Sequence, residues 1–253
     1  MEIISVINQK GGVGKSTIAQ TIAIGLVNEG KRVLFIDFDA QGNSTSTLPV
    51  EYPTPKNAFS VLIDQCDVRD AIQHTEYCDI IPSSSLLSTA DLALNNMIAR
   101  EYQLQDVLKK ANLDDSYDFI IFDTPPSLGF LTINTLTCSD SAIIPAQADE
   151  FSLQGIRQLY RTITNIQEKT NHNLKVRGIV LNRFNGRTVI SKTVANLISK
   201  NAIEANTKLY NTKIRECTAF KEAQLVKKSI FDYAPNSNAA KDMKSLIKEI
   251  LEE

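Results

Sequence analysis

Residues 8–17 read Asn8-Gln9-Lys10-Gly11-Gly12-Val13-Gly14-Lys15-Ser16-Thr17. An apolar run over residues 3–7 precedes it, and an apolar helical pattern over residues 18–27 follows it. When a glycine-rich turn joins a strand to the start of a helix, backbone N–H groups can point inward at an anion. Lys15 is placed to reach the outer phosphates of a nucleotide, and the Ser16 hydroxyl to ligate Mg²⁺. The stretch therefore predicts a triphosphate-binding loop, because a chance glycine-rich turn would lack this flanking strand and helix.

The composition is that of an ordinary globular protein. With 253 residues, 43% of them hydrophobic, the chain can bury the core of one α/β domain or two small ones. A net charge of −2 gives no general attraction to nucleic acid, so DNA binding requires a local basic patch. No apolar run approaches the ~20 residues of a membrane span, and no signal peptide is expected before the first strand. Four scattered cysteines lack metal-ligand spacing and are expected to be small buried residues: Cys66, Cys78, Cys138 and Cys217.

Carboxylates follow two further apolar runs. Residues 31–37 read as a strand that ends in Asp37 and is followed by Phe38-Asp39, and residues 118–123 read as a strand that ends in Asp123. In a doubly wound sheet, ligands bind at the carboxyl ends of the parallel strands. Next to a phosphate loop, these acids are expected to serve Mg²⁺ or an attacking water. The alternative is a polar strand end with Asx-type turns.

Strands alternate with helical patterns along the whole chain, with no linker and no internal repeat. This order predicts a single domain over residues 1–253, built on a doubly wound, mostly parallel β-sheet with helices on both faces. After Asp123, residues 124–129 form a proline-rich turn with one glycine. Such a turn suits a switch that senses a γ-phosphate, or it is merely a stiff connection.

The phosphate loop departs from the standard pattern, since Gln9 holds the place of the first glycine and Lys10 is an additional lysine. This form resembles the deviant Walker A motif of the ParA/MinD class of P-loop ATPases. Residues 35–43, 123–136 and 144–155 resemble further segments of that class, and the short ParA/Soj-type partition ATPases match best. Their long relatives carry an N-terminal DNA-binding extension. Only eight residues precede Gln9 here, so a self-repressing operator-binding role is not expected.

The resemblance implies roles for individual residues. Lys10, Lys15 and Asp39 are the implied catalytic residues; Lys10 would reach a partner subunit's phosphates, and Asp39 would position the attacking water. The implied metal site is Ser16, Asp39 and Asp123. The implied nucleotide-binding residues are Lys10, Gly11, Gly12, Val13, Gly14, Lys15, Ser16, Thr17, Glu150, Asn182 and Pro235.

The sequence departs from the family pattern at two places, the turn after Asp39 and the segment associated with DNA binding. Ala40 replaces a proline after Asp39, which is expected to loosen that turn. In residues 212–223, the two arginines that the family associates with DNA fall on Glu216 and Ala219. DNA contacts are therefore expected from other basic residues, or each of these is a solvated surface charge. The candidates are Arg187, Lys192, Lys213, Arg215, Lys221, Lys227 and Lys228.

The resemblance implies a Mg²⁺-dependent ATPase with slow intrinsic turnover that drives plasmid or chromosome partition. Its ATP-bound homodimer would bind DNA without sequence preference, and a centromere-binding ParB-type partner would stimulate hydrolysis and release. The expected location is cytoplasmic and nucleoid-associated, without a membrane partner.

Three alternatives remain open. A MinD-like membrane-associated positioning ATPase needs a basic amphipathic C-terminal helix. Residues 243–253 do carry an apolar stripe, but their tip is acidic, so core packing is expected. An iron–sulfur carrier of the same superfamily needs paired cysteines, which are absent from the sequence. An ATP-dependent scaffold for another cargo, with negligible hydrolysis, is the third.

Overall fold

A central β-sheet organises the computed structural model, which describes residues 1–252. The seven strands lie in the order β3-β4-β2-β5-β1-β6-β7, and all neighbours pair in parallel except β3 with β4. The prediction of a doubly wound, mostly parallel sheet is confirmed. The strands are β1 (Glu2–Val6), β2 (Val33–Asp37), β3 (Gln73–His74), β4 (Asp79–Ile81), β5 (Phe119–Asp123), β6 (Ser141–Ala146) and β7 (Lys175–Leu181).

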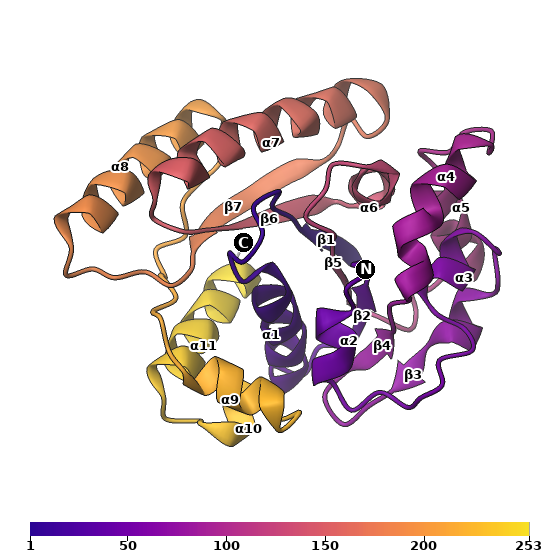
Figure 1. Cartoon of the computed structure of the whole chain (residues 1–253), viewed down its shortest axis with the longest axis horizontal. Helices are drawn as coiled ribbons and strands as arrows, with labels where there is room; N and C mark the ends of the chain where they lie inside the picture. Colours follow the sequence, from indigo (N-terminus) through magenta and orange to yellow (C-terminus); the bar gives the residue numbers. More distant parts are fainter. Residues whose placement is uncertain (253) are drawn as a thin grey trace.

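Helices cover both faces of this sheet (Figure 1). One face packs against α1 (Lys15–Asn28), α9 (Ala219–Leu225), α10 (Ile230–Tyr233) and α11 (Asn238–Leu251). The other face packs against α3 (Ala58–Leu62), α4 (Ala90–Asn95), α5 (Gln103–Ala111), α6 (Phe130–Cys138), α7 (Glu150–Lys169) and α8 (Val189–Glu204). Short pieces complete the chain: α2 (Asn43–Thr47) and the 3₁₀ turns η1 (Val68–Ala71) and η2 (Ser85–Thr89).

The central strands are buried on both faces, as their continuous apolar runs require. Every residue of β2 is buried, and so are the last four of β5. Parallel pairing sets Asp37 of β2 and Val6 of β1 opposite Asp123 of β5. Two of the predicted carboxylates thus meet at one edge of the sheet, beside the loop that follows β1.

The C-terminal helix packs inside the protein. Leu246, Ile247 and Ile250 of α11 are buried in the core that also holds α1. At the contact, a Cβ on Gly25 would overlap the side chain of Ile247, so a larger residue there would force Ile247 to move. The apolar stripe of α11 therefore serves core packing, as the sequence predicted. Among residues 1–252, no helix combines the length and apolarity that a bilayer crossing needs.

Candidate nucleotide-binding site

The glycine-rich loop closes over the start of α1 in a conformation that needs glycine. Gly12 and Gly14 have φ angles of +77° and +88°, which residues with a Cβ rarely adopt. A Cβ on Gly14 would also overlap the side-chain amide of Asn182. That amide donates a hydrogen bond of 2.7 Å to the carbonyl of Val13. Asn182, directly after β7, therefore fixes the position of the loop through this hydrogen bond.

A cavity of about 370 Å³ opens beside this loop. That volume falls in the range of small-molecule sites. Besides the loop and the start of α1, four other parts of the chain contribute to its wall: the segment after β2, the turn after β5, the turn after β7 and helix α9. The lining residues are Lys10, Gly11, Gly12, Gly14, Lys15, Ser16, Thr17, Gln20, Asp39, Gln41, Asn43, Ser46, Thr47, Pro126, Arg183 and Gln224.

Lys15 is held among carboxylates inside this site. Its side chain is 7% exposed, and its Nζ lies 3.0 Å from Oδ1 of Asp123 and 3.9 Å from Oδ2 of Asp39. The same ammonium donates to the carbonyl of Thr124. A buried ammonium is tolerated only when it is paired in this way. Lys15 is therefore a fixed positive charge at the cavity, next to both acids from which a metal site was predicted.

The two acids after β2 take different places. Asp37 is fully buried and accepts hydrogen bonds from the backbone N–H of Thr45 at 2.8 Å and from its hydroxyl at 2.7 Å. Burial, and then the charge of Asp123, raise the pKa of Asp37 to about 7, although the bonds from Thr45 oppose the shift. Asp39 lies at the cavity wall. Asp37 thus anchors α2, whereas Asp39 is available to a ligand.

Sequence reasoning did not identify the hydroxyls of α2. Ser44 donates to Oδ2 of Asp123 at 2.8 Å, so this carboxylate is held by Ser44 on one oxygen and by Lys15 on the other. The run of hydroxyl residues in positions 44–47, directly after the acidic segment, was the available signal. Both hydroxyl contacts fix carboxylates that sequence reasoning did identify.

The additional lysine of the loop is paired within the same chain. Nζ of Lys10 lies 2.5 Å from Oδ2 of Asp149. Asp149 also caps α7, because its other oxygen accepts the backbone N–H of Ser152 at 2.9 Å. Burial alone would raise the pKa of Asp149, but the hydrogen bonds from Lys10 and Ser152 together lower it. Asp149 stays ionised and holds Lys10 at the rim of the cavity.

Four predicted nucleotide-binding residues lie outside the cavity wall: Val13, Glu150, Asn182 and Pro235. Asn182 is buried beneath the loop, as described above. Glu150 is the exposed first residue of α7, and Pro235 is exposed between α10 and α11. The structure instead brings Arg183 and Gln224 to the cavity, and sequence reasoning missed both. Neither belongs to a motif, so no local signal pointed to them.

The candidate DNA-binding residues fall into two regions. Arg187 is exposed just before α8, and Lys192 is exposed in the first turn of that helix. The rest lie in the C-terminal region, where Lys221, Lys227 and Lys228 are exposed on or just after α9 and Lys213 lies 5.6 Å from the ring of Phe184. Arg215 differs, because its guanidinium donates to both oxygens of Asp242 at 2.9 and 2.6 Å.

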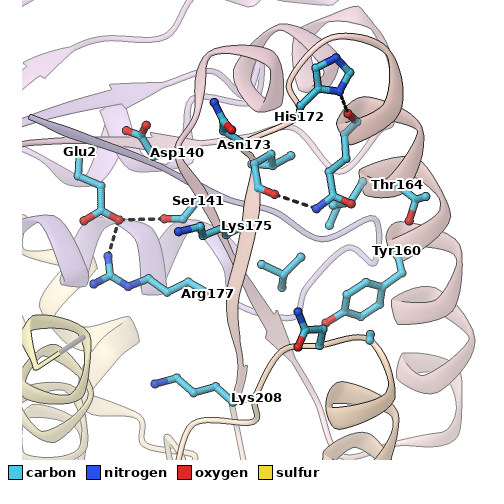
Figure 2. A pocket seen from close by; sticks show the side chains of 16 residues that line it. Glu2, Asp140, Ser141, Tyr160, Thr164, His172, Asn173, Lys175, Arg177 and Lys208 are labelled. Atoms are coloured by element: carbon cyan, nitrogen blue, oxygen red, sulfur yellow. Dashed lines mark hydrogen bonds and ion pairs between the residues drawn. The ribbon is translucent and has the colours of Figure 1, made fainter.

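A larger cleft of about 1230 Å³ lies elsewhere, between the end of α7, the start of β7 and the loop after α8 (Figure 2). One acidic and one basic side chain of this cleft already bind each other. Glu2 accepts hydrogen bonds from Arg177 at 2.6 Å and from Ser141 at 3.0 Å. None of the predicted nucleotide, metal or DNA residues lines it. The smaller cavity at the glycine-rich loop is therefore the candidate site.

Known proteins resemble this chain over nearly its whole length. A family model described as an AAA domain matches residues 1–176. The sporulation initiation inhibitor protein Soj of Bacillus subtilis is 38% identical over 252 residues, which cover 98% of each chain. The chromosome partitioning protein ParA of Caulobacter vibrioides is 35% identical over 198 residues, which cover 77% of this chain and 74% of that protein.

Solved structures agree with these relatives. Cobyrinic acid a,c-diamide synthase from Mycobacterium smegmatis, with bound ADP and magnesium, aligns with a TM-score of 0.83 and 28% identity, covering 99% of this chain and 94% of that one. A putative plasmid partition protein from Borrelia burgdorferi, bound to AMPPNP, aligns with a TM-score of 0.81 and 25% identity, covering 99% and 98%. These bound groups agree with the predicted ligands, ATP and Mg²⁺.

Proposed function

The chain belongs to the ParA/MinD-type P-loop ATPases, and from this premise we propose that it is a partition ATPase whose ATP-bound homodimer binds DNA without sequence preference. One observation carries the proposal. Lys15 is fixed inside the nucleotide cavity, while Lys10, five residues earlier, lies at its rim. Lys15 serves the nucleotide of its own subunit, and Lys10 is placed to serve that of a second copy.

The residues around the cavity fit ATP and Mg²⁺. The N–H groups of the loop and the ammonium of Lys15 would hold the phosphates. The hydroxyl of Ser16 and the carboxylates of Asp39 and Asp123 are oxygen ligands of the kind that Mg²⁺ prefers. Bound Mg²⁺ supplies charge neutralisation on the transferred phosphate. Asp39 lies within 3.9 Å of Nζ of Lys15, so it can hold an attacking water next to the same phosphate. Lys15 stabilises the negative charge that develops there.

Exposed apolar side chains near Lys10 support the second copy. Phe151 of α7 and Val189 and Ile190 of α8 are 74%, 80% and 66% exposed. Each lies at the start of its helix. Residues near them in the sequence, Asp149 and Ser191, line one hollow, and Asp149 is the residue paired with Lys10. Large apolar side chains gathered on a surface indicate a contact site. A second copy bound there would draw Lys10 away from Asp149 and toward the phosphates of the nucleotide in that second copy. A lone subunit lacks that lysine, so its turnover is slow.

DNA binding is assigned to the lysines around α9, Lys221, Lys227 and Lys228. They are exposed, and their helix also reaches the nucleotide cavity through Gln224. The net charge of the chain is −2, so DNA binding depends on such a local patch. Its contacts with DNA phosphates are salt-sensitive and independent of the DNA sequence. A centromere-binding, ParB-type protein then stimulates hydrolysis and releases the dimer from the nucleoid.

The test is DNA binding by the purified protein with ATP, ADP or no nucleotide across a salt series. We expect binding with ATP only, equal affinity for unrelated sequences, and a steep loss of affinity as the salt concentration rises. Binding that ignores the nucleotide would refute the proposal. Phosphate release, measured with and without DNA, separates an ATPase from a scaffold that does not hydrolyse ATP.

A further inference from the structure

A side chain from the C-terminal region reaches the phosphate loop. Gln224 is the sixth residue of α9, and its Nε2 donates a hydrogen bond of 3.0 Å to Oγ1 of Thr17. The two residues are 207 positions apart in the sequence, and both line the nucleotide cavity. Thr17 belongs to the loop motif, whereas Gln224 belongs to no motif.

The helix that carries Gln224 is firmly placed. Ala219 and Ala223 of α9 are buried in the core that includes α1, and Phe220 packs against the same core. The backbone N–H of Lys228 closes the end of the helix on the carbonyl of Ala223 at 2.9 Å. Gln224 therefore approaches Thr17 from a fixed backbone, so its amide has a defined direction.

The hydrogen bond constrains the hydroxyl of Thr17. A threonine hydroxyl carries one proton and can accept through its oxygen. Because the oxygen accepts from Gln224, the proton must point away from that amide. Among residues 1–252, no protein acceptor takes this proton. The hydroxyl lines the cavity, so its donor is available to a ligand there.

Thr17 also lies where phosphates bind. The first intrahelical hydrogen bond of α1 runs from Ile18 to Gly14, so the N–H groups of residues 15–17 have no partner within the helix. Such groups attract anions. The free hydroxyl proton of Thr17 adds a side-chain donor to this set.

We infer that Gln224 is a positioning residue for the nucleotide phosphates, which acts by directing the hydroxyl proton of Thr17 into the cavity. The inference rests on the proposed nucleotide binding and adds a residue to that site. Loop N–H groups of this kind hold the phosphates that ADP and ATP share. Gln224 therefore contributes equally to the affinity for both nucleotides, and not to the hydrolytic step.

Three variants and their combination test the inference. Gln224→Met keeps the size of the side chain but removes the donor, and Thr17→Val removes the hydroxyl but keeps the shape. Gln224→Glu replaces the donor by a carboxylate, which would accept the hydroxyl proton and repel phosphate. Dissociation constants for ADP and for a non-hydrolysable ATP analogue, with Mg²⁺, are measured by titration calorimetry. Leu225→Ala, an exposed change on the same helix, is the matched control.

Loss of one hydrogen bond weakens binding by about three- to tenfold, which we expect for Gln224→Met with both nucleotides. Gln224→Glu should weaken binding more, and Leu225→Ala should leave it unchanged. In the Thr17→Val background, Gln224→Met should change affinity by less than about twofold, because the hydroxyl on which it acts is gone.

An equal loss from Gln224→Met with and without the Thr17 hydroxyl would overturn the inference, since Gln224 would then act only through the packing of α9. Unchanged affinity in Gln224→Met would overturn it too. Thermal unfolding of each variant identifies a loss that comes from misfolding. If the unaltered protein binds neither nucleotide, the proposed function itself is wrong; if it binds both and the variants match it, only the role of Gln224 is wrong.

Discussion

Lys15 and Asp123 form a buried ion pair across the sheet edge, with 3.0 Å between Nζ and Oδ1. The lysine comes from the first turn of α1 and the acid from the end of β5, 108 positions later. In the nucleotide-free protein this pair keeps a positive charge ready where phosphates would bind. When a nucleotide binds, Asp123 and Asp39 must share the ammonium of Lys15 with its phosphates. The same ion pair therefore contributes both to the stability of the fold and to nucleotide binding.

Removal of Lys15 should act on both properties. Lys15→Ala should abolish nucleotide binding, because the main charge facing the phosphates is lost. It should also lower the free energy of unfolding of the nucleotide-free protein by about 3 kcal/mol, since buried carboxylates lose their partner. Calorimetric titration and urea denaturation measure the two effects. Lys109→Ala, on the exposed side of α5, is the control; nucleotide binding that survives Lys15→Ala contradicts the site.

Asp39→Ala should separate binding from hydrolysis. The variant keeps Lys15 and the loop, so it should bind ATP and form dimers that stay on DNA. Phosphate release should fall by at least about 100-fold, as is typical when a group that handles the attacking water is lost. Sedimentation with ATP and DNA measures the assembly. A variant that stays monomeric with ATP would show that Asp39 has another role.

Lys10→Ala should lose ATP-dependent dimerisation while it keeps ADP affinity within about threefold, because Lys10 lies at the rim and pairs with Asp149 in its own chain. Analytical ultracentrifugation with a non-hydrolysable analogue measures the dimer. Phe151→Ser removes an exposed apolar side chain from the proposed contact and should weaken the same dimer. Dimers of normal affinity in both variants would place the interface elsewhere.

The stability of the nucleotide-free protein should fall as the pH rises from 6 to 8. Burial and the charge of Asp123 raise the pKa of Asp37 to about 7 in the folded state, far above its value in an unfolded chain. The folded state therefore holds a proton at pH 6 that the unfolded state has lost, and folding is favoured below the folded pKa. Between pH 6 and pH 8, the titration of this one carboxyl group lowers the free energy of unfolding by about 1 kcal/mol. Denaturation at both pH values measures it, and Asp37→Asn should remove the difference.

The basic residues should not contribute equally to DNA binding. Each of Lys221→Ala, Lys227→Ala and Lys228→Ala should weaken binding to any sequence and reduce the salt slope by about 1. Arg215→Ala should change DNA affinity little and lower stability instead, because its guanidinium already binds both oxygens of Asp242. A DNA defect in Arg215→Ala larger than in the lysine variants would reverse this assignment.

Local patterns predicted the strands of the sheet centre, because residues buried on both faces leave continuous apolar runs. They did not predict α6. Its polar residues Thr132, Asn134 and Thr135 are buried, so no polar face marks it as a surface helix. Asn134 donates to the carbonyl of Arg100 and accepts the backbone N–H of Leu104, contacts that only the packed chain can supply. The antiparallel edge strand β3, two residues long, is also too short for a periodic signal.

Local patterns in the sequence were enough to identify the loop at residues 10–17 and the acids Asp39 and Asp123, because glycine conformations, a helix start and a strand end are local properties. The partners of these residues could be found only in the folded chain. Asp149 reaches Lys10, Ser44 reaches Asp123, and Gln224 reaches Thr17 from 207 positions away. Such pairs depend on how helices pack on the sheet, and no spacing along the chain records that packing. The residues of the loop were therefore readable in advance, whereas the side chains that hold and direct them were not.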